Sequence, residues 1–314
     1  MILTQDAFSG VSDLDRARQL FRTNVHYVEF ETHSYCNRRC GYCPNVSGDR
    51  LGPNQRVDDA LFDRVIGDLR EIDFRGVIVL SNYNEPLSDP YIITRIAQTR
   101  AALPDANIQI YTNGDYLTAD LLDQLAMAGL NYMHISIHMR PDDIYSDAYA
   151  IERMTEICGR VGRGVKLGTL QPGTICAACI PHNSIHIEIR AINYWRHGSN
   201  RGGSVEDVAG PQSRMQACHY PFSRFTIGHS GRVVPCCEIR GDRPEHAHNV
   251  IGQLRADEPI YLVYANAAAA RWRRSMLGTR PRTGPCAHCP SGVLPSGSPL
   301  EKALIELGTH YPAE

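Results

Sequence analysis

Three features that mark particular classes of protein are missing from this sequence of 314 residues. It contains no apolar run near the ~18 residues that a membrane-spanning helix needs. Its net charge is only −2, so it has no general basic field for nucleic acid. The first residues, Met1 to Phe8, lack the basic and apolar segments of a signal peptide. We therefore expect a cytoplasmic protein with no membrane or nucleic-acid partner.

Cysteine, in contrast, is abundant, with 11 residues. In a secreted chain these would suggest disulfides, whereas in a cytosolic chain they suggest metal binding or catalysis. Because no export signal is evident, we expect the second. The length suits one large domain, or one large and one small domain.

The most informative stretch follows a strand-like run over 25–32. It places Cys36, Cys40 and Cys43 at a C-x3-C-x2-C spacing. A [4Fe–4S] cluster needs four ligands, usually thiolates, so three cysteines in one loop hold a cluster whose fourth iron stays open to another ligand. The alternatives are core cysteines or a structural zinc site, although zinc favours paired C-x2-C units with a second pair or histidines nearby.

This cysteine loop resembles the signature of the radical S-adenosylmethionine (SAM) superfamily. The resemblance implies that SAM binds the open iron and that Tyr42 lies against its adenine. Glu85 with Pro86 matches the family's Glu-Pro segment, whose acid meets the methionine amino group, and an ammonium group needs such an acceptor. Asn84 stands where the family usually has glycine, which changes the approach of the backbone. Asn113 belongs to a Thr-Asn-Gly turn common in the family.

Strands and helices alternate up to about residue 204, which predicts parallel strands joined by helices. The expected strands are 25–32, 75–81, 107–112, 131–138, 164–170 and 184–192, and the expected helices are 58–71, 91–102, 118–128 and 145–160. Asp58 and Thr118 are plausible N-caps. No helical period spans 171–183, so one outer helix should be missing. The pattern suits an α/β domain over 25–204, the partial (β/α)6 barrel that the resemblance implies, after a surface lead-in over 1–24.

Alternation along three strands places polar side chains on one face of the expected sheet. The three sets are Glu29, Glu31 and His33; His134, Ser136 and His138; and Ser184, His186, Glu188 and Arg190. A packed barrel centre would carry branched apolar side chains instead, so we expect a lumen that holds cofactor and substrate. Ser136, His138 and Arg190 are our cofactor-binding candidates on this face. The alternative for each residue is an ordinary, satisfied buried polar group.

A second set of cysteines follows a polar linker over 205–217. It comprises Cys218, a hairpin pattern over 222–235, the neighbours Cys236 and Cys237, a long helix near 257–277, and the pair Cys286 and Cys289. Four thiolates from three places can enclose a cluster with no open iron. We assign Cys218, Cys236, Cys286 and Cys289 as the ligands. Cys237 in place of Cys236, or a four-cysteine zinc ribbon, are the alternatives.

This segment, 205–292, resembles the twitch domain, a shortened SPASM module of α+β structure that holds one auxiliary [4Fe–4S] cluster. Its spacing is close to that of the 2-deoxy-scyllo-inosamine dehydrogenase type. Residues 293–314 remain as a C-terminal tail.

The remaining cysteines have less definite roles. Cys158 falls in an expected helix and should be core. Cys176 and Cys179 fall in the expected loop after the fifth strand, at the barrel end that holds the first cluster. Cys179 and Cys237 are candidate hydrogen-atom donors, and the alternative is that they are merely loop or buried thiols. Arg201, in an Arg-Gly-Gly stretch, is a candidate contact for a substrate or SAM carboxylate, because its planar guanidinium suits such anions.

The resemblance covers residues 25–290 and implies a reaction. An electron from a donor such as flavodoxin or ferredoxin cleaves SAM, and the 5′-deoxyadenosyl radical takes a hydrogen atom from the substrate. The auxiliary cluster then accepts the substrate electron, giving oxidation, or acts as a redox relay. Because no long peptide-recognition domain precedes the first cluster, we expect a small polar metabolite, of aminocyclitol, sugar or nucleoside type, in natural-product biosynthesis. An epimerase, a ribosomal-peptide maturase and a non-enzymatic iron–sulfur redox sensor are the alternatives.

Overall fold

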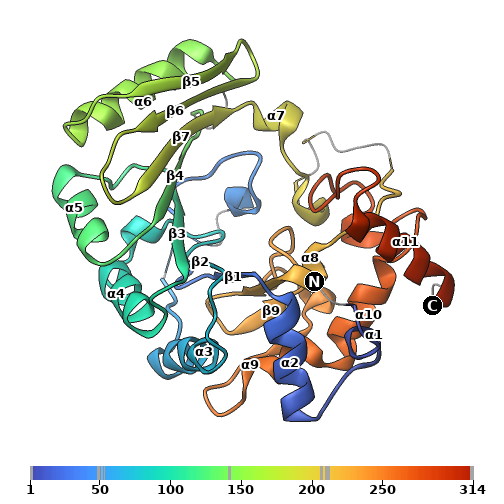
Figure 1. Cartoon of the computed structure of the whole chain (residues 1–314). Coiled ribbons are helices and arrows are strands. Elements are labelled where there is room, and N and C mark those ends of the chain that lie inside the picture. Colours follow the sequence, from blue (N-terminus) through green and yellow to red (C-terminus); the bar gives the residue numbers. More distant parts are fainter. Residues whose placement is uncertain are drawn as a thin grey trace.

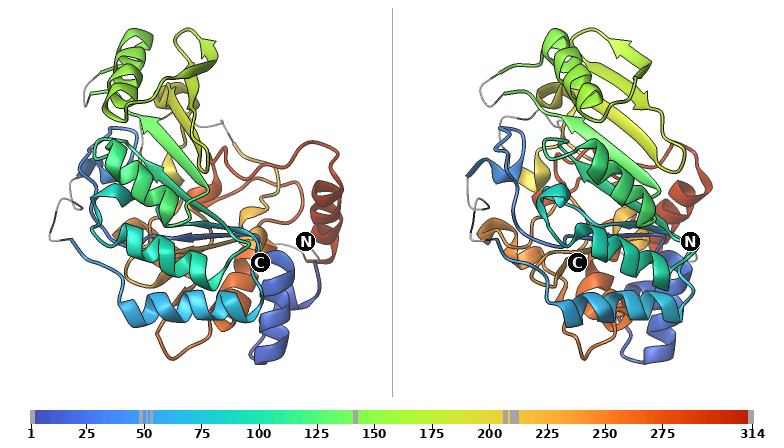
Figure 2. Two further views of the ribbon diagram at one scale, coloured as in Figure 1. Left: turned by 60° about the vertical axis from the view of Figure 1, so that its left-hand side comes forward. Right: turned by 90° about the vertical axis from the view of Figure 1, so that its left-hand side faces the viewer.

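A curved, ten-stranded sheet runs through the protein in the order β10-β9-β8-β1-β2-β3-β4-β7-β6-β5. The computed structural model describes residues 3–47, 50, 52, 54–140, 143–205, 208 and 213–311. Helices α3 to α6 lie along the outer side of the curve (Figure 1), and the two turned views keep them on that one side (Figure 2). Within the described part of the chain, no helix is both long and apolar enough to span a membrane.

The centre of the sheet is parallel, as expected. It consists of β1 (Tyr27–Phe30), β2 (Val77–Val79), β3 (Asn107–Thr112), β4 (Tyr132–Ile137) and β7 (His186–Ile192). The first three crossovers are α3 (Asp59–Glu71), α4 (Ile92–Ala102) and α5 (Ala119–Met127). Both predicted N-caps are confirmed, because Asp58 accepts from the amides of Ala60 and Leu61, and Thr118 accepts from that of Leu121. Branched side chains on the outer face of the strands pack against these helices.

The far edge of the sheet differs from the prediction. The expected loop over 171–183 contains a further strand, β6 (Ile175–Ile180), which pairs antiparallel with both β5 (Lys166–Gln171) and β7. The predicted fifth strand is therefore an edge strand, and β7 takes the place beside β4. The alternation of β6 is carried by alanine and cysteine as well as isoleucine, and such small residues give a weak strand signal. Helix α6 (Asp147–Arg160) covers this edge.

The second half of the chain continues the same sheet. Strand β8 (Arg224–Ile227) pairs parallel with β1, and β9 (Arg232–Val234) and β10 (Gly252–Gln253) follow antiparallel. The predicted hairpin is confirmed, and Gly231 makes its turn with φ +81°, a backbone conformation that favours glycine. Short helices α7 (Tyr194–His197) and α8 (Tyr220–Ser223) precede it. The overall class, an α/β barrel-like domain followed by a small α+β domain, is confirmed.

Helices from both ends of the chain pack together. They are α1 (Asp6–Ser9), α2 (Leu14–Asn24), α9 (Ile260–Ala265), α10 (Ala267–Ser275) and α11 (Pro299–His310), the last lying in the predicted tail. The prediction of a surface lead-in was wrong, because Phe21 of α2 is fully buried against Tyr261 and Tyr264. The single long helix expected near 257–277 is divided at Asn266, whose side chain caps α10 at the amide of Ala269.

Among the described residues there are also five short 3₁₀ helices. They are η1 (Pro44–Ser47), η2 (Pro86–Ser88), η3 (Arg201–Gly203), η4 (Pro244–Asn249) and η5 (Gly284–Cys286). Four of them contain or adjoin predicted site residues, because η1 follows the cysteine loop, η2 follows Glu85, η3 begins at Arg201 and η5 ends on Cys286.

Candidate functional site

A cavity of about 490 Å³ lies at the carboxyl ends of the parallel strands, the end where barrels of this kind place their functional groups. It brings together most of the predicted site residues. These are Cys36, Cys40, Tyr42, Cys43, Asn84, Glu85, Asn113, Ser136, His138, Arg190, Arg201 and Cys237. Residues more than 190 positions apart in the sequence thus line the same cavity, which we call the central cavity.

The three cysteines of the predicted cluster loop all face the central cavity. The loop is tightened by a hydrogen bond from the Cys43 amide to the Cys40 carbonyl, 2.9 Å. Burial raises the pKa of Cys36 and of Cys40 to about 12, so without metal these groups are thiols, and iron would have to displace their protons. Three sulfur donors in one loop, facing an open cavity, fit a [4Fe–4S] cluster with one free iron position.

An arginine–aspartate pair anchors this loop to the sheet. Arg38 donates two hydrogen bonds of 2.7 Å to the carboxylate of Asp115, which follows β3, and Asn37 donates a third of 2.8 Å. Arg153 of α6 reaches the same carboxylate at 2.9 Å. These cations hold the pKa of Asp115 below its usual range despite its burial. Sequence reasoning missed the pair, because nothing local marks a contact between residues 77 positions apart.

Tyr42, at one side of the central cavity, belongs to a group of aromatic side chains that also includes Tyr194 and Trp195. Its ring stacks on Tyr194 with 4.7 Å between centroids, and Trp195 meets it edge-on at 5.8 Å. Its hydroxyl lies 2.9 Å from Nδ1 of His138. Burial lowers the pKa of His138 to about 3, so this imidazole is neutral at physiological pH. The group presents flat, uncharged surface to the cavity, which suits the predicted contact with an adenine ring.

Glu85 ties the segment after β2 to the turn after β3. It accepts hydrogen bonds from the Thr112 hydroxyl at 2.5 Å, the Asn113 amide at 2.7 Å and the Leu87 amide at 3.0 Å. Burial raises its pKa to about 7. Within the described part of the chain, Oε2 accepts only from Asn113, so this oxygen keeps a lone pair that could meet a ligand ammonium. The side chain of the neighbouring Asn84 is used within the fold instead. Its oxygen accepts a hydrogen bond from the amide of Asn82, and its nitrogen is hydrogen-bonded to the ring of His33.

The opposite wall is built by strands β1 and β8. The guanidinium of Arg224 lies 3.7 Å from the Glu29 carboxylate and 3.9 Å from the Cys237 thiol. The same guanidinium stacks over the rings of Tyr220 and Tyr27, 3.8 and 4.2 Å from their centroids. Arg201 stands nearby, 3.6 Å from the buried carboxylate of Glu238. This wall therefore carries charged groups of both signs.

The prediction that every polar residue of β1 lines the lumen was only partly right. Glu29 does, but Glu31 pairs with Arg50 and His229 outside the central cavity. His33 is buried in contact with Asn84 and Ser88. Strand β1 ends at Phe30, so strict alternation does not continue past it. On β7, Arg190 lines the central cavity, whereas His186 and Glu188, and Ser184 before the strand, are not among its lining residues.

The four predicted ligands of the second cluster lie together, and we call them the auxiliary thiols. They are Cys218, Cys236, Cys286 and Cys289. Burial raises the pKa of each, and Cys218 adds to the effect on the other three, which shows that the sulfur atoms are neighbours. Gly292 lies so close that a Cβ there would sit 2.5 Å from the Cys218 sulfur. Three of the four cysteines are buried and Cys286 is half-buried, and four thiol donors match the number of ligands that a fully ligated [4Fe–4S] cluster needs.

Cys237 faces the other way. It lines the central cavity, where burial and Glu29 raise its pKa, while its carbonyl accepts a hydrogen bond of 2.7 Å from Tyr83. Within the described residues, no three His, Cys, Asp or Glu side chains already surround a single metal position. The geometry of the two neighbours nevertheless favours Cys236 over Cys237 as the auxiliary ligand.

The remaining cysteines lie away from the central cavity. Cys158 is buried in α6, and Cys176 is buried on β6 with its sulfur 3.8 Å from that of Met154. Cys179, also on β6, lines a separate pocket with Asn131 and His186, at the amino ends of β4 and β7. The expectation of a loop at the cluster end was wrong, because these residues form a strand whose register sets Cys179 opposite Glu188.

The orientation of the neighbouring cysteines makes a prediction about iron content. Cys236→Ser should lower iron and sulfide from two clusters' worth to one after anaerobic reconstitution, because an auxiliary ligand is lost. Cys237→Ser, the matched control one residue away, should keep both clusters. Cys36→Ala/Cys40→Ala/Cys43→Ala should keep only the auxiliary cluster. If Cys236→Ser kept the iron content of two clusters and Cys237→Ser fell to that of one, Cys237 rather than Cys236 would be the auxiliary ligand.

Comparisons with known proteins agree with this geometry. The pattern of the Radical SAM superfamily matches residues 30–161, and that of an iron-sulfur cluster-binding domain, SPASM, matches 218–290. The chain is 24% identical over 263 residues to the S-adenosyl-L-methionine-dependent 2-deoxy-scyllo-inosamine dehydrogenase of Niallia circulans, which covers 83% of this chain and 91% of that enzyme. It is 25% identical over 150 residues to a GTP 3′,8-cyclase of Desulforamulus reducens, 47% of this chain and 45% of that one.

Among solved structures, the crystal structure of BtrN in complex with AdoMet and 2-DOIA matches with a TM-score of 0.56 at 22% identity, over 80% of this chain and 87% of that one. The first domain implies SAM and a [4Fe–4S] cluster, and the second implies auxiliary iron–sulfur binding. With a cysteine loop at the carboxyl ends of a parallel sheet and a second set of cysteines later in the chain, the protein contains a radical SAM domain over residues 30–161 followed by an iron-sulfur cluster-binding SPASM domain over residues 218–290.

Proposed function

We propose that this protein oxidises a small metabolite that bears hydroxyl or amino groups, of aminocyclitol, sugar or nucleoside type. The observation that carries the proposal is the wall at Cys236 and Cys237. One of these neighbours faces the central cavity and the other belongs to the auxiliary thiols. An electron acceptor held by those thiols would lie directly behind the wall that a substrate touches. The relationship to an aminocyclitol dehydrogenase over 83% of the chain supports the same reaction class.

The two metal groups would divide the chemistry between them. Cys36, Cys40 and Cys43 would hold the first cluster, and the auxiliary thiols the second. When bound, the first cluster with SAM supplies a 5′-deoxyadenosyl radical, and the second supplies a one-electron acceptor. The protein's own residues bind and orient the substrate, exclude water, and take up the proton that oxidation releases.

Glu29 is our candidate for the proton acceptor. Oxidation at a carbon that bears a hydroxyl removes a hydrogen atom, a proton and an electron, so a base is needed beside the electron acceptor. Glu29 lines the central cavity and contributes to the raised pKa of Cys237, so the two groups are close. Burial raises the pKa of Glu29 itself, which makes its carboxylate a stronger base near neutral pH. The hydroxyl of Thr226 donates a hydrogen bond of 3.0 Å to Oε2 of the Glu29 carboxylate.

The remaining walls fit a polar substrate. Tyr27 and Tyr111 bring their hydroxyls within 3.3 Å of each other. Burial lowers the pKa of His134 to about 4, which leaves its ring neutral. The Nε of Arg190 is buried and has no hydrogen-bond partner among the described residues. Such a mixture of donors and acceptors suits several hydroxyl or amino groups on one ring, because an unpaired buried polar group is costly.

The role of Glu29 can be tested by Glu29→Gln. With a chemical reductant, SAM and an aminocyclitol substrate, we expect product formation to fall by about 10²–10⁴-fold, the usual contribution of a general base, while 5′-deoxyadenosine still forms. In the unsubstituted enzyme the rate should rise with pH through the raised pKa of Glu29, because only the carboxylate accepts a proton. That rise should vanish in Glu29→Gln.

Glu152→Gln, an exposed change on α6, is the matched control and should behave as the unsubstituted enzyme. Unchanged product formation and an unchanged pH profile in Glu29→Gln would exclude Glu29 as the base. Failure of well-loaded protein to form any 5′-deoxyadenosine would go further and favour a redox sensor over an enzyme.

One observation favours a second candidate function, epimerisation. The Cys237 thiol lines the central cavity, and burial raises its pKa, so it keeps its hydrogen at neutral pH. A thiol can return a hydrogen atom to the opposite face of a substrate radical, and the resulting thiyl radical would then regain one electron, supplied by the external reductant through the auxiliary cluster, and one proton from water. Oxidation and epimerisation share the first abstraction and differ only in this second step.

Deuterated water separates the two outcomes. For oxidation we expect a product two hydrogens lighter than the substrate, with Cys237→Ala retaining the reaction. A product of unchanged formula that carries one solvent deuterium at carbon, lost in Cys237→Ala, would establish the epimerase instead. Cys179→Ala serves as the control, because this thiol lies outside the central cavity and its loss should change neither the mass nor the yield.

A further inference from the structure

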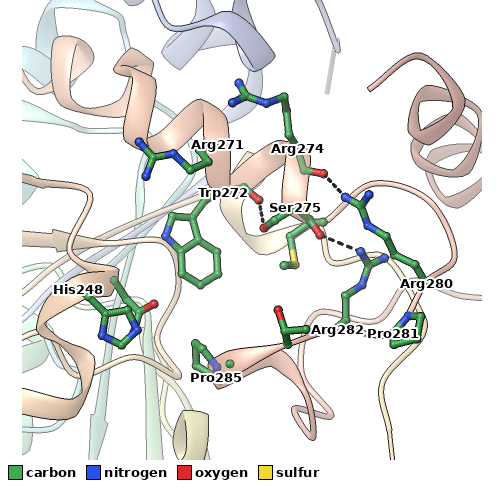
Figure 3. Close-up of a pocket in the computed structure, with 13 residues that line it drawn as sticks. His248, Arg271, Trp272, Arg274, Ser275, Arg280, Pro281, Arg282 and Pro285 are labelled. Carbon is green, nitrogen blue, oxygen red and sulfur yellow. Dashed lines mark hydrogen bonds between the residues drawn. The ribbon is translucent and has the colours of Figure 1, made fainter. Parts of the chain in front are cut away.

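A second cavity, of about 480 Å³, lies on α10 and the segment that follows it. We call it the arginine pocket. Figure 3 shows Trp272 and His248 on one side of its opening and Arg280 with Arg282 on the other. Four arginines and a histidine line it, and none of the described lining residues is acidic.

Two of the arginines are committed to the fold. Arg282 is buried and donates hydrogen bonds to five backbone carbonyls, those of Gln216, Ser275, Leu277, Met215 and Gly278. Arg274 donates to the carbonyl of Phe8. These two side chains brace the pocket and would not be free to bind a ligand.

The other cationic groups are available. Arg271 is exposed, and no carboxylate pairs with it in the described part of the chain. Arg280 donates one bond of 2.8 Å, from Nη2 to the Arg274 carbonyl, which leaves most of its guanidinium uncommitted. His248 is exposed at the rim. The pocket thus offers an excess of hydrogen-bond donors and positive charge, which selects an anionic occupant.

A buried hydrogen-bond donor in the pocket, the side-chain amide of Asn249, also favours an occupant that accepts hydrogen bonds. Asn249 lines the pocket and is only 4% exposed, and its amide nitrogen has no hydrogen-bond partner among the described residues. Leaving such a group unpaired costs free energy. A carboxylate bound in the pocket could supply the acceptor that this amide lacks.

The arginine pocket adjoins the auxiliary thiols. The side chain of Trp272 packs against the small apolar cluster that contains Cys236. Thr283, Gly284 and Pro285 form another part of the pocket and lead directly into Cys286. An occupant would therefore contact Trp272, which packs against the cluster containing Cys236, and Pro285, which immediately precedes Cys286. The positively charged side chains of the arginine pocket thus lie next to residues that contact or precede the auxiliary thiols.

The shape of the pocket favours a protein over a small molecule. Six lining residues are exposed, namely His248, Arg271, Ser275, Pro281, Thr283 and Gly284. Sites for small ligands usually bury most of the ligand surface, whereas transient electron-transfer partners meet through small, open and charged surfaces.

We propose that an acidic one-electron carrier protein docks at the arginine pocket and exchanges electrons with the auxiliary cluster. This rests on the auxiliary cluster of the proposed function. The reduced carrier would give up one electron and become oxidised, and the auxiliary cluster would become reduced by that one electron. No bond is made or broken in this step. In the reverse direction, the same contact removes the electron that substrate oxidation leaves on the cluster.

The test compares two electron donors on the holoenzyme, with reduction followed by bleaching of the visible cluster absorbance. Flavodoxin hydroquinone is the acidic protein donor, and the reduced methyl viologen cation is the small donor. For Arg271→Glu/Arg280→Glu we expect the flavodoxin rate to fall about tenfold at low salt, because charge complementarity governs association. The methyl viologen rate should not fall. Added salt should slow the unsubstituted enzyme towards the variant, as screening predicts.

Arg255→Glu, an exposed change in the same domain, is the matched control and should keep the flavodoxin rate. Iron content and the melting temperature confirm that each variant is folded and loaded. An unchanged flavodoxin rate in the double variant would overturn the proposal. So would citrate binding to the unsubstituted protein but not to the double variant, with the flavodoxin rate unaffected, since that result would mark a small-anion site. Failure of the proposed oxidation would appear separately, as absence of product with methyl viologen.

Discussion

The parallel pairing of β8 with β1 is the interaction on which the site depends. It joins Tyr27–Phe30 to Arg224–Ile227 across nearly 200 positions of sequence. This pairing continues the parallel barrel strands directly into the cysteine-rich second half. With it, Arg224 is placed beside Glu29 and the hairpin that follows delivers Cys237 to the central cavity. One set of backbone hydrogen bonds therefore brings the cluster loop and Cys237, the neighbour of the auxiliary ligand Cys236, to the same cavity.

Burial imposes the second constraint. Charged groups taken out of water must be paired, and the cavity walls follow this rule. Arg38 is paired with Asp115, Arg224 with Glu29 and Arg201 with Glu238. The cluster loop and the opposite wall are thus held in place before any ligand arrives, as precise radical chemistry requires. The buried Nε of Arg190, unpaired in the described part of the chain, is a place where a substrate could supply the missing acceptor.

Local patterns in the sequence predicted the parts of this structure that local patterns control. The C-x3-C-x2-C spacing, the first four strands, their helices and the N-caps at Asp58 and Thr118 need only short-range information. Strand β6 escaped because alanine and cysteine carry little strand preference, and the break at Asn266 escaped because helical periodicity continues on both sides of it.

Long-range contacts account for the rest of what the sequence could not show. No periodicity indicates that Arg38 meets Asp115, or which of Cys236 and Cys237 turns towards the central cavity. Both cysteines lie in the bend and turn after β9, where no strand alternation indicates the direction of either side chain. The same holds for Arg271 and Arg282, which look alike in the sequence, although one is exposed and the other is buried among backbone carbonyls.

The most direct test of the central claim is an anaerobic crystal structure of the reconstituted protein with SAM, with anomalous scattering recorded at the iron and zinc edges. We expect iron at two places, one on Cys36, Cys40 and Cys43 with SAM in the central cavity, and one on the auxiliary thiols with Cys237 unligated. A single zinc ion among the auxiliary thiols, or iron bound to Cys237, would contradict an electron acceptor behind the substrate wall.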